Sequence, residues 1–363
     1  MIPLKEKPQY VNLDPNFTPL PKYGHLSEKT PEFLAVEPHI AAAYDKFWLG
    51  CPDFPTFRRE AEVEAEAAAG SPDPYRREVQ TELLHFPARD GHLVELKVYK
   101  SPKVSAEATL VYRMHGGGFC VGNHETDGAE NVHAATNPDI VVVSVDYRLA
   151  PEHPFPKGLE DSYDGLIWCQ QNAKTLGINP SKIILAGSSA GANLAAVLTL
   201  LTHKNSIPGI LAQILHFPTV CHPQAFPSAR YEFGSYVQNA ENCVLSTLRY
   251  EAFLDAYLPV PPGSGSCSSR DMRLSPLLAD SDSLANLPPA LIQCAGVDIF
   301  RDEAFAYAIA LTEADNTVEI YGYGGVPHCF PAVIPSHPST PLFYERYNAF
   351  LKKYASSSST NSA

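Results

Sequence analysis

A serine set between two glycines is the first feature of this sequence that could do chemistry. In ILAGSSAGANLAA, Ile184 to Ala196, the pattern G-x-S-x-G places Ser189 two residues after Gly187 and two before Gly191. A sharp strand-to-helix turn requires small residues at these positions, because larger side chains would collide. Short runs of small residues also occur by chance in loops, so the motif needs support from other parts of the chain.

A serine hydroxyl is a poor nucleophile at neutral pH, so Ser189 would need a histidine base, a carboxylate and hydrogen-bond donors for an oxyanion. Donors are offered by MHGGGF, Met114 to Phe119, where three glycines leave backbone N–H groups open to a ligand. A phosphate loop is the competing interpretation. It is disfavoured because no Lys followed by Ser or Thr stands in P-loop spacing, and the glycines do not follow the G-x-G-x-x-G order.

The carboxylate that would orient the histidine is expected directly after a strand. In PALIQCAGVDIFRDE, Asp298 comes directly after an apolar run, so its side chain is expected at the carboxyl edge of a sheet, beside the serine. Asp302 and Glu303 are rivals. They fall about one turn into the following helix, where surface ion pairing or capping is the expected use.

The base is expected in a glycine-rich loop near the end of the chain. In YGYGGVPHCF, His328 follows the strand-like run TVEIY and reaches the same sheet edge. His337 is the alternative, but its proline-rich surroundings, IPSHPST, indicate a surface connection. The chain order Ser189, Asp298, His328 is the order in which α/β-hydrolases carry their triad. Cys294 and Cys329 lie outside any elbow and are poor candidates for the nucleophile.

The elements that position these residues are indicated by apolar, strand-like runs that alternate along the chain with segments of helical periodicity. Mostly apolar runs predict central strands, an Asp90-Gly91 turn predicts a hairpin near the start of the sheet, and Leu194, Val197, Leu198 and Leu201 show the i, i+3, i+4, i+7 spacing of a packed helix. Such alternation predicts a mainly parallel sheet flanked by helices. The predicted strands are VQTELLHF, HLVELKVYK, ATLVYRMH, IVVVSVDY, KIILAG, GILAQILHF, PALIQCAG and TVEIYGY.

Two regions interrupt this rhythm and are expected to form a lid over the carboxyl edge of the sheet. Residues 1–75 look helical after a proline-rich lead, with Thr30 as N-cap, Pro31 as first helical residue and Gly70 as a stop. Residues 218–287 contain one predicted helix, Leu245 to Tyr257, and the loop PVPPGSGSCSS. The predicted core is then 76–217 with 288–355, and the serine-rich residues 356–363 are expected to be a disordered tail.

Composition excludes some functions. The formal net charge of -13 and the lack of basic clusters oppose nonspecific nucleic-acid binding, and no window approaches the roughly 18 apolar residues of a membrane span. The first residues do not resemble a secretory signal, so a cytoplasmic location is expected. Eight cysteines are scattered without a C-x-x-C pair, which favours buried free thiols, although their even number leaves a secreted protein with disulfides open.

Five motifs together resemble the hormone-sensitive-lipase-like branch of the α/β-hydrolases. They are HGGGF, DYRLAPEHPFP, GSSAG, VDIFRDE and HCF, and the resemblance covers roughly residues 80 to 355. The resemblance implies an α/β-hydrolase fold with a helical lid and a serine esterase that forms an acyl-enzyme. It implies Ser189 as nucleophile, His328 as general base and Asp298 as its partner. The implied oxyanion donors are the N–H groups of Gly117, Gly118 and Ala190, with Gly116 as a substitute.

The same resemblance assigns supporting roles. His115 would fix the glycine loop by hydrogen bonding, and a turn near the site would be built by Asp146, Arg148, Glu152 and His153. Aromatic residues of the lid would either line an acyl pocket or pack within the lid, and they are Phe47, Trp48, Phe54, Phe226, Tyr231, Phe233 and Tyr236. No metal or organic cofactor is expected, and the expected substrate is a small ester or thioester.

Two residues depart from the family pattern. Many relatives carry an acidic residue where this chain has Ser188, and a glycine directly after the catalytic histidine where it has Cys329. Three alternatives stay open. A biosynthetic thioester hydrolase or acyltransferase, served by an acyl carrier partner, would use the same acyl-enzyme. A hormone receptor of this fold would lack the histidine, and a dehydratase would carry threonine in place of the serine, so both are disfavoured.

Overall fold

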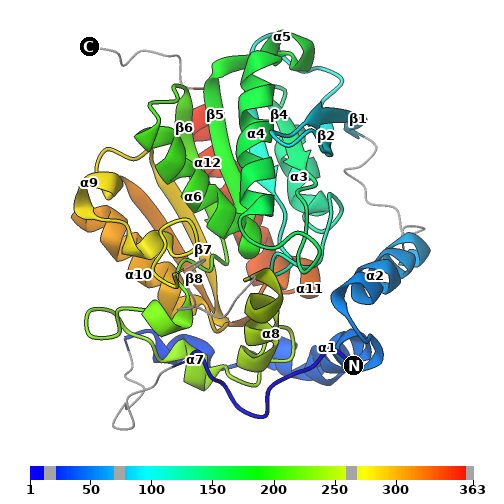
Figure 1. Ribbon diagram of the computed structural model, residues 1–363, viewed down its shortest axis with the longest axis vertical. Coiled ribbons are helices and arrows are strands. Elements are labelled where there is room, and N and C mark those ends of the chain that lie inside the picture. Colours follow the sequence, from blue (N-terminus) through cyan, green and yellow to red (C-terminus); the bar gives the residue numbers. More distant parts are fainter. Residues whose placement is uncertain (12–21, 69–77, 259–267, 357–363) are drawn as a thin grey trace.

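The computed structural model describes residues 1–11, 22–68, 78–258 and 268–356. Its centre is a sheet of eight strands in the order β1-β2-β4-β3-β5-β6-β7-β8 (Figure 1). β1 pairs with β2 and β2 with β4 in antiparallel fashion, and the other neighbours are parallel. The strands are β1 Gln80–Pro87, β2 Leu93–Lys100, β3 Ala108–Met114, β4 Ile140–Val145, β5 Ile178–Ser188, β6 Ile210–His216, β7 Ala290–Val297 and β8 Val318–Pro327.

Helices cover both faces of the sheet because its strands are apolar on both sides. Along β3, Leu110 and Tyr112 face one core, shared with α4, α6 and α10, whereas Val111 between them faces a second core, shared with α3 and α12. This alternation is the two-residue period of a strand. The larger helices are α1 Pro31–Gly50, α2 Phe54–Ala68, α3 Gly128–Ala135, α4 Lys157–Gln171, α6 Ala190–Lys204, α8 Thr247–Tyr257, α10 Arg301–Glu313 and α12 Ser339–Ala355.

The predicted fold class is confirmed in its main features. Each of the eight predicted strands is present, with ends shifted by a few residues, and the hairpin turns at Gly91, where φ is +82°. Thr30 caps α1 by accepting a hydrogen bond from the Phe33 N–H, and Pro31 is the first helical residue. Short elements between the larger helices were not predicted, namely η1 Gly24–Ser27, α5 Ala173–Leu176, η3 Pro223–Ala225, α7 Ser235–Gln238, η4 Pro276–Leu278, α9 Ser281–Leu284 and α11 Phe330–Val333.

The carboxyl ends of the parallel strands point toward α1, α7 and α8, which gather at one end of the molecule with the first residues of the chain (Figure 1). The N-terminal segment is held there by α8. Glu251 accepts hydrogen bonds from the N–H groups of Gln9 and Tyr10, and it forms an ion pair with Lys5. Segments far apart in sequence therefore meet over the sheet edge at which Asp298 and His328 were expected.

Three predictions fall on parts of the chain that the structure does not describe. Gly70 as a helix stop, residues 259–267 of the lid loop and residues 357–363 of the tail lie outside the described residues.

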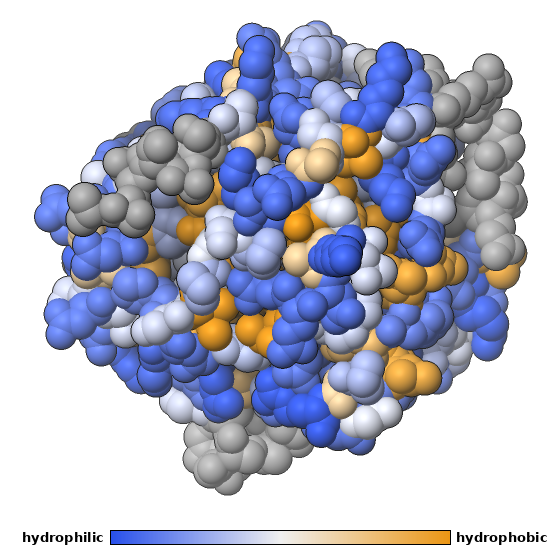
Figure 2. Space-filling model, turned by 90° about the horizontal axis from the view of Figure 1, so that it is seen from above, coloured by the Kyte–Doolittle hydropathy of each residue, from blue (hydrophilic) through white to orange (hydrophobic). Residues whose placement is uncertain are grey.

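Seen from the end that carries α5, the surface is mostly hydrophilic, with apolar side chains in small separate groups (Figure 2). Among the described helices, none combines the length and the apolar character needed to cross a bilayer.

Candidate active site

Ser189 lies on the tight turn between β5 and α6. β5 ends at Ser188, α6 begins at Ala190, and Ser189 itself has φ +54° and ψ -117°, which is an unfavourable conformation for a residue with a side chain. A Cβ atom on Gly187 would lie 2.2 Å from the Gly191 carbonyl oxygen, and one on Gly191 would lie 2.1 Å from the Met114 carbonyl oxygen. The two glycines are therefore required by close backbone approach, as the spacing predicts.

The structure brings the three predicted side chains together. His328 Nε2 lies 3.0 Å from Ser189 Oγ, and His328 Nδ1 lies 2.6 Å from Asp298 Oδ2. Because a carboxylate can only accept, Nδ1 carries the proton and Nε2 of the neutral ring is free to accept from the serine. The other Asp298 oxygen accepts from the Phe300 N–H at 3.0 Å, which fixes the carboxylate in the turn after β7.

The environment of His328 shifts its pKa. Burial lowers it, but the charge and hydrogen bond of Asp298, together with Cys329 beside the ring, outweigh burial and hold the pKa of His328 well above its ordinary value. Ser189, Asp298 and His328 are all buried. Cys329 lines the cavity directly after His328 in the chain.

The glycine-rich stretch follows β3 and faces the serine. Gly117 has φ +120° and Gly118 φ +58°, and a Cβ on Gly117 would lie only 1.9 Å from the Val121 carbonyl oxygen. Among the described residues, no acceptor takes the N–H of Gly117 or Gly118. Ala190 is the first residue of α6, so its N–H has no partner within the helix. Gly116 also lines the cavity.

A cavity of about 280 Å³ opens onto Ser189 and His328. One wall is aromatic and comes from α1, α2 and α8. The other wall is partly acidic and carries Asp127 and Glu130, at the start of α3. The aromatic side chains that line the cavity are Tyr44, Trp48, Phe57, Phe119, Tyr250, Phe253, Phe300 and Tyr344.

Of the seven lid aromatics considered from the sequence, Trp48 alone appears in this lining. Phe47 stacks on Phe57, and Phe54 stacks on Phe253, so both support the wall from behind. Phe226, Tyr231, Phe233 and Tyr236 pack on one another. For these six residues lid packing was the correct interpretation. Tyr44 and Phe57 were missed, although they stand four residues before and nine residues after Trp48 on the same helical pair.

A buried charge network beneath the turn explains how the chain tolerates Ser188. Arg113 of β3 is fully buried and pairs with Glu130 of α3. Ser188 Oγ accepts from Arg113 Nη2 at 2.9 Å and lies 3.3 Å from Glu130 Oε2, and His216 Nδ1 lies 2.9 Å from the same oxygen. Glu130 of α3 thus places a carboxylate against the hydroxyl of Ser188.

Asp302 and Glu303 are not surface residues, contrary to the expectation from sequence. Asp302 is 1% exposed, pairs with Arg301 and accepts from the Ser235 N–H at 2.8 Å. Glu303 is fully buried and accepts from the N–H groups of Val220 and Cys221. Burial raises the pKa of Glu303 to about 7, although its hydrogen bonds oppose the shift. Both carboxylates stand in the first turn of α10, and through these hydrogen bonds they hold the loops that contain Ser235, Val220 and Cys221.

His337 is also buried rather than exposed. Its Nε2 lies 3.0 Å from Thr30 Oγ1 and its Nδ1 accepts from the Ser339 N–H at 3.1 Å, so both nitrogens are engaged away from Ser189. The expectation of a surface connection is therefore wrong, and the residue ties the start of α1 to the segment before α12.

The residues assigned supporting roles are placed around the glycine loop. His115 Nδ1 lies 2.7 Å from the Gly116 carbonyl oxygen. Arg148 forms ion pairs with Asp90 and Asp161 at 2.9 Å and 2.6 Å, and Glu152 pairs with Arg58 of α2. All cysteines within the described residues are free thiols, and most are buried, as their scattered positions indicate.

Comparisons with known proteins agree with this architecture. A family model described as alpha/beta hydrolase fold matches residues 110–332, more than half of the chain. Carboxylesterase NlhH of Mycobacterium tuberculosis is 36% identical over 247 residues, which cover 67% of this chain and 74% of that protein. An arylesterase of Saccharolobus solfataricus is 32% identical over 275 residues, covering 74% of this chain and 81% of its own.

Among solved structures, a thermostable esterase from Pseudomonas putida superimposes with a TM-score of 0.75 at 26% identity. The superposition covers 89% of this chain and 98% of that one. Sequence and structure comparisons thus point to one group of enzymes.

Proposed function

The chain belongs to the α/β-hydrolase fold family, in its hormone-sensitive-lipase-like branch, and is a carboxylic ester hydrolase. From this premise we propose that it cleaves small esters through a covalent acyl-enzyme formed on Ser189. The observation that carries the proposal is the chain of contacts from Ser189 Oγ to His328 at 3.0 Å and from His328 to Asp298 at 2.6 Å.

In the proposed acylation step, Ser189 Oγ attacks the ester carbonyl carbon while His328 Nε2 takes the hydroxyl proton. The imidazolium that forms is stabilised by Asp298, which remains ionised. The tetrahedral intermediate then collapses, the C–O bond to the alcohol breaks, and His328 returns the proton to the leaving oxygen. A positioned base of this kind is worth about 10² to 10⁴ in rate.

We assign the oxyanion to the N–H groups of Gly117, Gly118 and Ala190. The first two come from the loop after β3, and the third is at the amino end of α6, where the helix dipole also favours negative charge. Each donor of this type is worth about 10² to 10³ in turnover. Deacylation repeats the cycle with water as the nucleophile, activated by the same His328 nitrogen.

We propose that residues 1–75 and 218–287 act as the lid of this site. Side chains from α1, α2 and α8 supply its aromatic wall, and Phe253 packs directly against Gly118, where an added Cβ would come within 2.4 Å of the ring. A cavity of about 280 Å³ is at the small end for ligand sites and favours esters of modest size. A carrier-bound thioester calls for a wide pocket and gains no support from this volume.

The test uses two adjacent serines. Purified full-length protein is treated with a fluorophosphonate, and the adduct is mapped by mass spectrometry, while turnover of p-nitrophenyl butyrate is measured in parallel. We expect Ser189→Ala to lose both the label and turnover, by about 10⁴-fold or more. Ser188→Ala is the matched control and should keep the label at Ser189. A Ser189→Ala protein that folds and retains more than a small part of the activity would overturn the proposal.

A further inference from the structure

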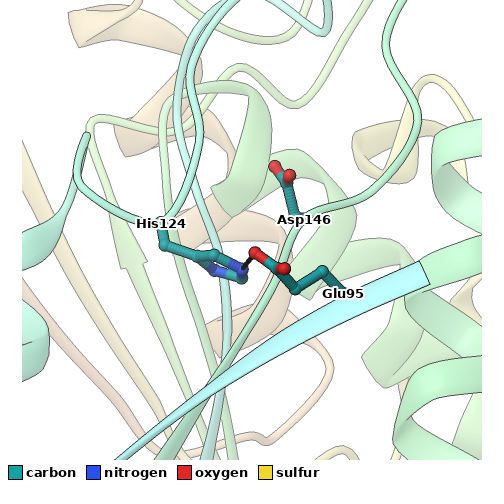
Figure 3. A group of neighbouring side chains, drawn as sticks. All are labelled: Glu95, His124 and Asp146. Atoms are coloured by element: carbon teal, nitrogen blue, oxygen red, sulfur yellow. Dashed lines mark ion pairs between the residues drawn. The ribbon is translucent and has the colours of Figure 1, made fainter. Parts of the chain in front are cut away.

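Behind the glycine loop, outside the catalytic cavity, three side chains with metal-ligand chemistry converge (Figure 3). Glu95 comes from β2, Asp146 from the segment directly after β4, and His124 from the loop that leads into α3. One potential ligand atom from each lies within 4.8 Å of the others. None of the three lines the cavity that contains Ser189, so this cluster is separate from the site described above.

The imidazole of His124 has a nitrogen without a partner. The side chain is 7% exposed, and its Nδ1 is held 2.9 Å from Ser144 Oγ. Its Nε2 has no hydrogen-bond partner among the described residues and faces Glu95 Oε1 at 3.5 Å. Buried polar atoms are almost always paired, so a buried nitrogen that faces a carboxylate without a hydrogen bond requires an explanation.

A second buried imidazole shows the same feature. His115 is 1% exposed, and its Nδ1 lies 2.7 Å from the Gly116 carbonyl oxygen, which can only accept. Nδ1 therefore carries the proton, and Nε2 of the neutral ring presents its lone pair. This Nε2 also lacks a partner among the described residues, and it lies 3.7 Å from Asp146 Oδ1. A carbonyl that orients a histidine in this way is the usual outer support of a metal ligand.

We propose that Glu95, His124 and Asp146 bind a divalent transition-metal ion, with His115 as a neighbour that contacts Asp146. Imidazole nitrogens combined with carboxylate oxygens form the donor set that Zn²⁺ accepts in proteins, whereas Mg²⁺ and Ca²⁺ prefer oxygen alone. The charges agree, because the carboxylates of Glu95 and Asp146 bring two negative charges to the group, and a dication neutralises them. The carboxylate side chains are 33% and 38% exposed, so an ion can enter from solvent.

The ion would connect segments that meet only in the folded chain. It joins β2, the end of β4, and the loop between β3 and α3, and its ligand Asp146 lies 3.7 Å from His115, the first residue of the glycine loop. It takes no part in the acyl chemistry, for which the cavity residues suffice. Its expected effect is to stabilise the fold, because an ion that binds only the folded chain shifts the unfolding equilibrium toward it.

The test measures binding directly. Full-length protein, phosphonylated at its reactive serine so that His328 is blocked, is stripped with EDTA and titrated with Co²⁺ and Zn²⁺. We expect one equivalent of Co²⁺ to give visible d–d absorption, Zn²⁺ to displace it, and Zn²⁺ to raise the melting temperature. Glu95→Gln and His124→Ala should each weaken Zn²⁺ binding by about tenfold or more, at least the loss seen when a supporting residue of a metal site is removed.

Glu82→Gln is the matched control, because Glu82 is an exposed carboxylate on the neighbouring strand β1 and should leave binding unchanged. The isosteric Glu95→Gln keeps the test decisive if His124→Ala fails to fold. The proposal is overturned if the phosphonylated protein without substitutions binds no stoichiometric Co²⁺ or Zn²⁺ at micromolar concentration. It is also overturned if Glu95→Gln binds Zn²⁺ as tightly as Glu82→Gln. It is equally overturned if Mg²⁺ or Ca²⁺ raises the melting temperature as much as Zn²⁺ does.

Discussion

At the scale of single residues, Asp298 determines the pH at which His328 can act as a base. Burial lowers the pKa of His328, but the charge and hydrogen bond of Asp298, with a smaller contribution from Cys329, raise it well above the ordinary value of 6.5. A base must be unprotonated to accept the Ser189 proton, so kcat/KM should rise with pH and level off only above that raised pKa. A pH profile with an uncharged ester measures this. An inflection at or below the ordinary histidine value would contradict the assignment.

Asp298→Asn provides the comparison. Removal of the negative charge leaves burial as the main influence, so the inflection should move to lower pH. The plateau should also fall by about 10⁴-fold, the loss known when the aspartate of such a triad becomes asparagine, because the amide can donate and allows the wrong tautomer of the imidazole. An unchanged inflection in Asp298→Asn would mean that another group sets the pKa of His328.

Glu130 offers a second residue-scale prediction, this time about stability. Arg113 is fully buried, and loss of its nearest carboxylate leaves its charge compensated only in part, by Asp127 at 3.4 Å. Glu130→Gln should therefore reduce the free energy of unfolding by about 3 to 5 kcal/mol, the range for breaking one side of a buried pair. Urea unfolding monitored by circular dichroism measures the change. Glu313→Gln, which breaks an exposed pair with Arg230, should cost about 0 to 1 kcal/mol.

The same network can be tested by returning the acid to its usual position. Ser188 Oγ lies 2.9 Å from Arg113 Nη2, so an aspartate there would reach the guanidinium. Ser188→Asp combined with Glu130→Gln should recover much of the lost stability. If the double variant is no more stable than Glu130→Gln alone, Glu130 does not replace the acid of the relatives.

The sequence located the three candidate catalytic residues because each follows a recognisable strand and sits in a short motif. It did not reveal the network of Arg113, Glu130 and His216, whose members are separated by 17 and 86 residues and come from three different elements. The periodicity of apolar residues within one element does not indicate a contact between polar residues of different elements. The orphaned nitrogens of His115 and His124 were hidden for the same reason, since they become visible only when every polar atom around them has been assigned.

At the scale of elements, the packing of α6 against β3 depends on Gly191. A Cβ atom at this position would lie 2.1 Å from the Met114 carbonyl oxygen, which belongs to backbone and cannot rotate away. Gly191→Ala should push the start of α6 from the sheet, moving Ser189 and the Ala190 N–H together. We expect the free energy of unfolding to fall by about 1 to 3 kcal/mol, which is typical of overpacking. We also expect kcat/KM to fall, because the nucleophile and an oxyanion donor move with the helix.

Gly50→Ala is the control for this variant, because nothing lies within 4 Å of a Cβ added to Gly50, at the end of α1. Its stability should be unchanged or slightly increased. Thermal melts and steady-state rates on both proteins distinguish a local defect at the turn from a general intolerance of methyl groups. Equal behaviour of the two variants would show that the tight turn does not depend on Gly191.

The elements themselves were predictable because long apolar runs and helix caps are local signals. The burial of α10 was not. Asp302 and Glu303 stand in its first turn, where acidic residues commonly cap an exposed helix, yet the loops that contain Ser235, Val220 and Cys221 return over this turn and bury both carboxylates. Their environment is created by residues about 70 to 80 positions away. His337 is likewise buried against Thr30, which is 307 positions away.

At the scale of the whole molecule, the negative charge extends into the catalytic cavity. The chain carries a formal net charge of -13, and the acidic wall of the cavity contains two carboxylates, Asp127 and Glu130, against the single guanidinium of Arg113. Asp127 lies 3.4 Å from Arg113 and keeps one oxygen without a hydrogen-bond partner among the described residues. The field at Ser189 should therefore favour cationic or uncharged esters and disfavour anionic ones.

This field leads to a prediction about substrate charge. Acetylcholine and 3,3-dimethylbutyl acetate have nearly the same shape and differ in one positive charge, so the ratio of their kcat/KM values isolates the electrostatic contribution. Asp127→Asn keeps the volume of the side chain and removes its charge, and it should lower that ratio by about fivefold, equivalent to the about 1 kcal/mol of a charge pair at close range in water. Added salt should lower the wild-type ratio in the same direction, because it screens the field. Glu345→Gln, at an exposed position away from the cavity lining, should leave the ratio unchanged, whereas an equal effect of both substitutions would assign the selectivity to overall charge instead of Asp127.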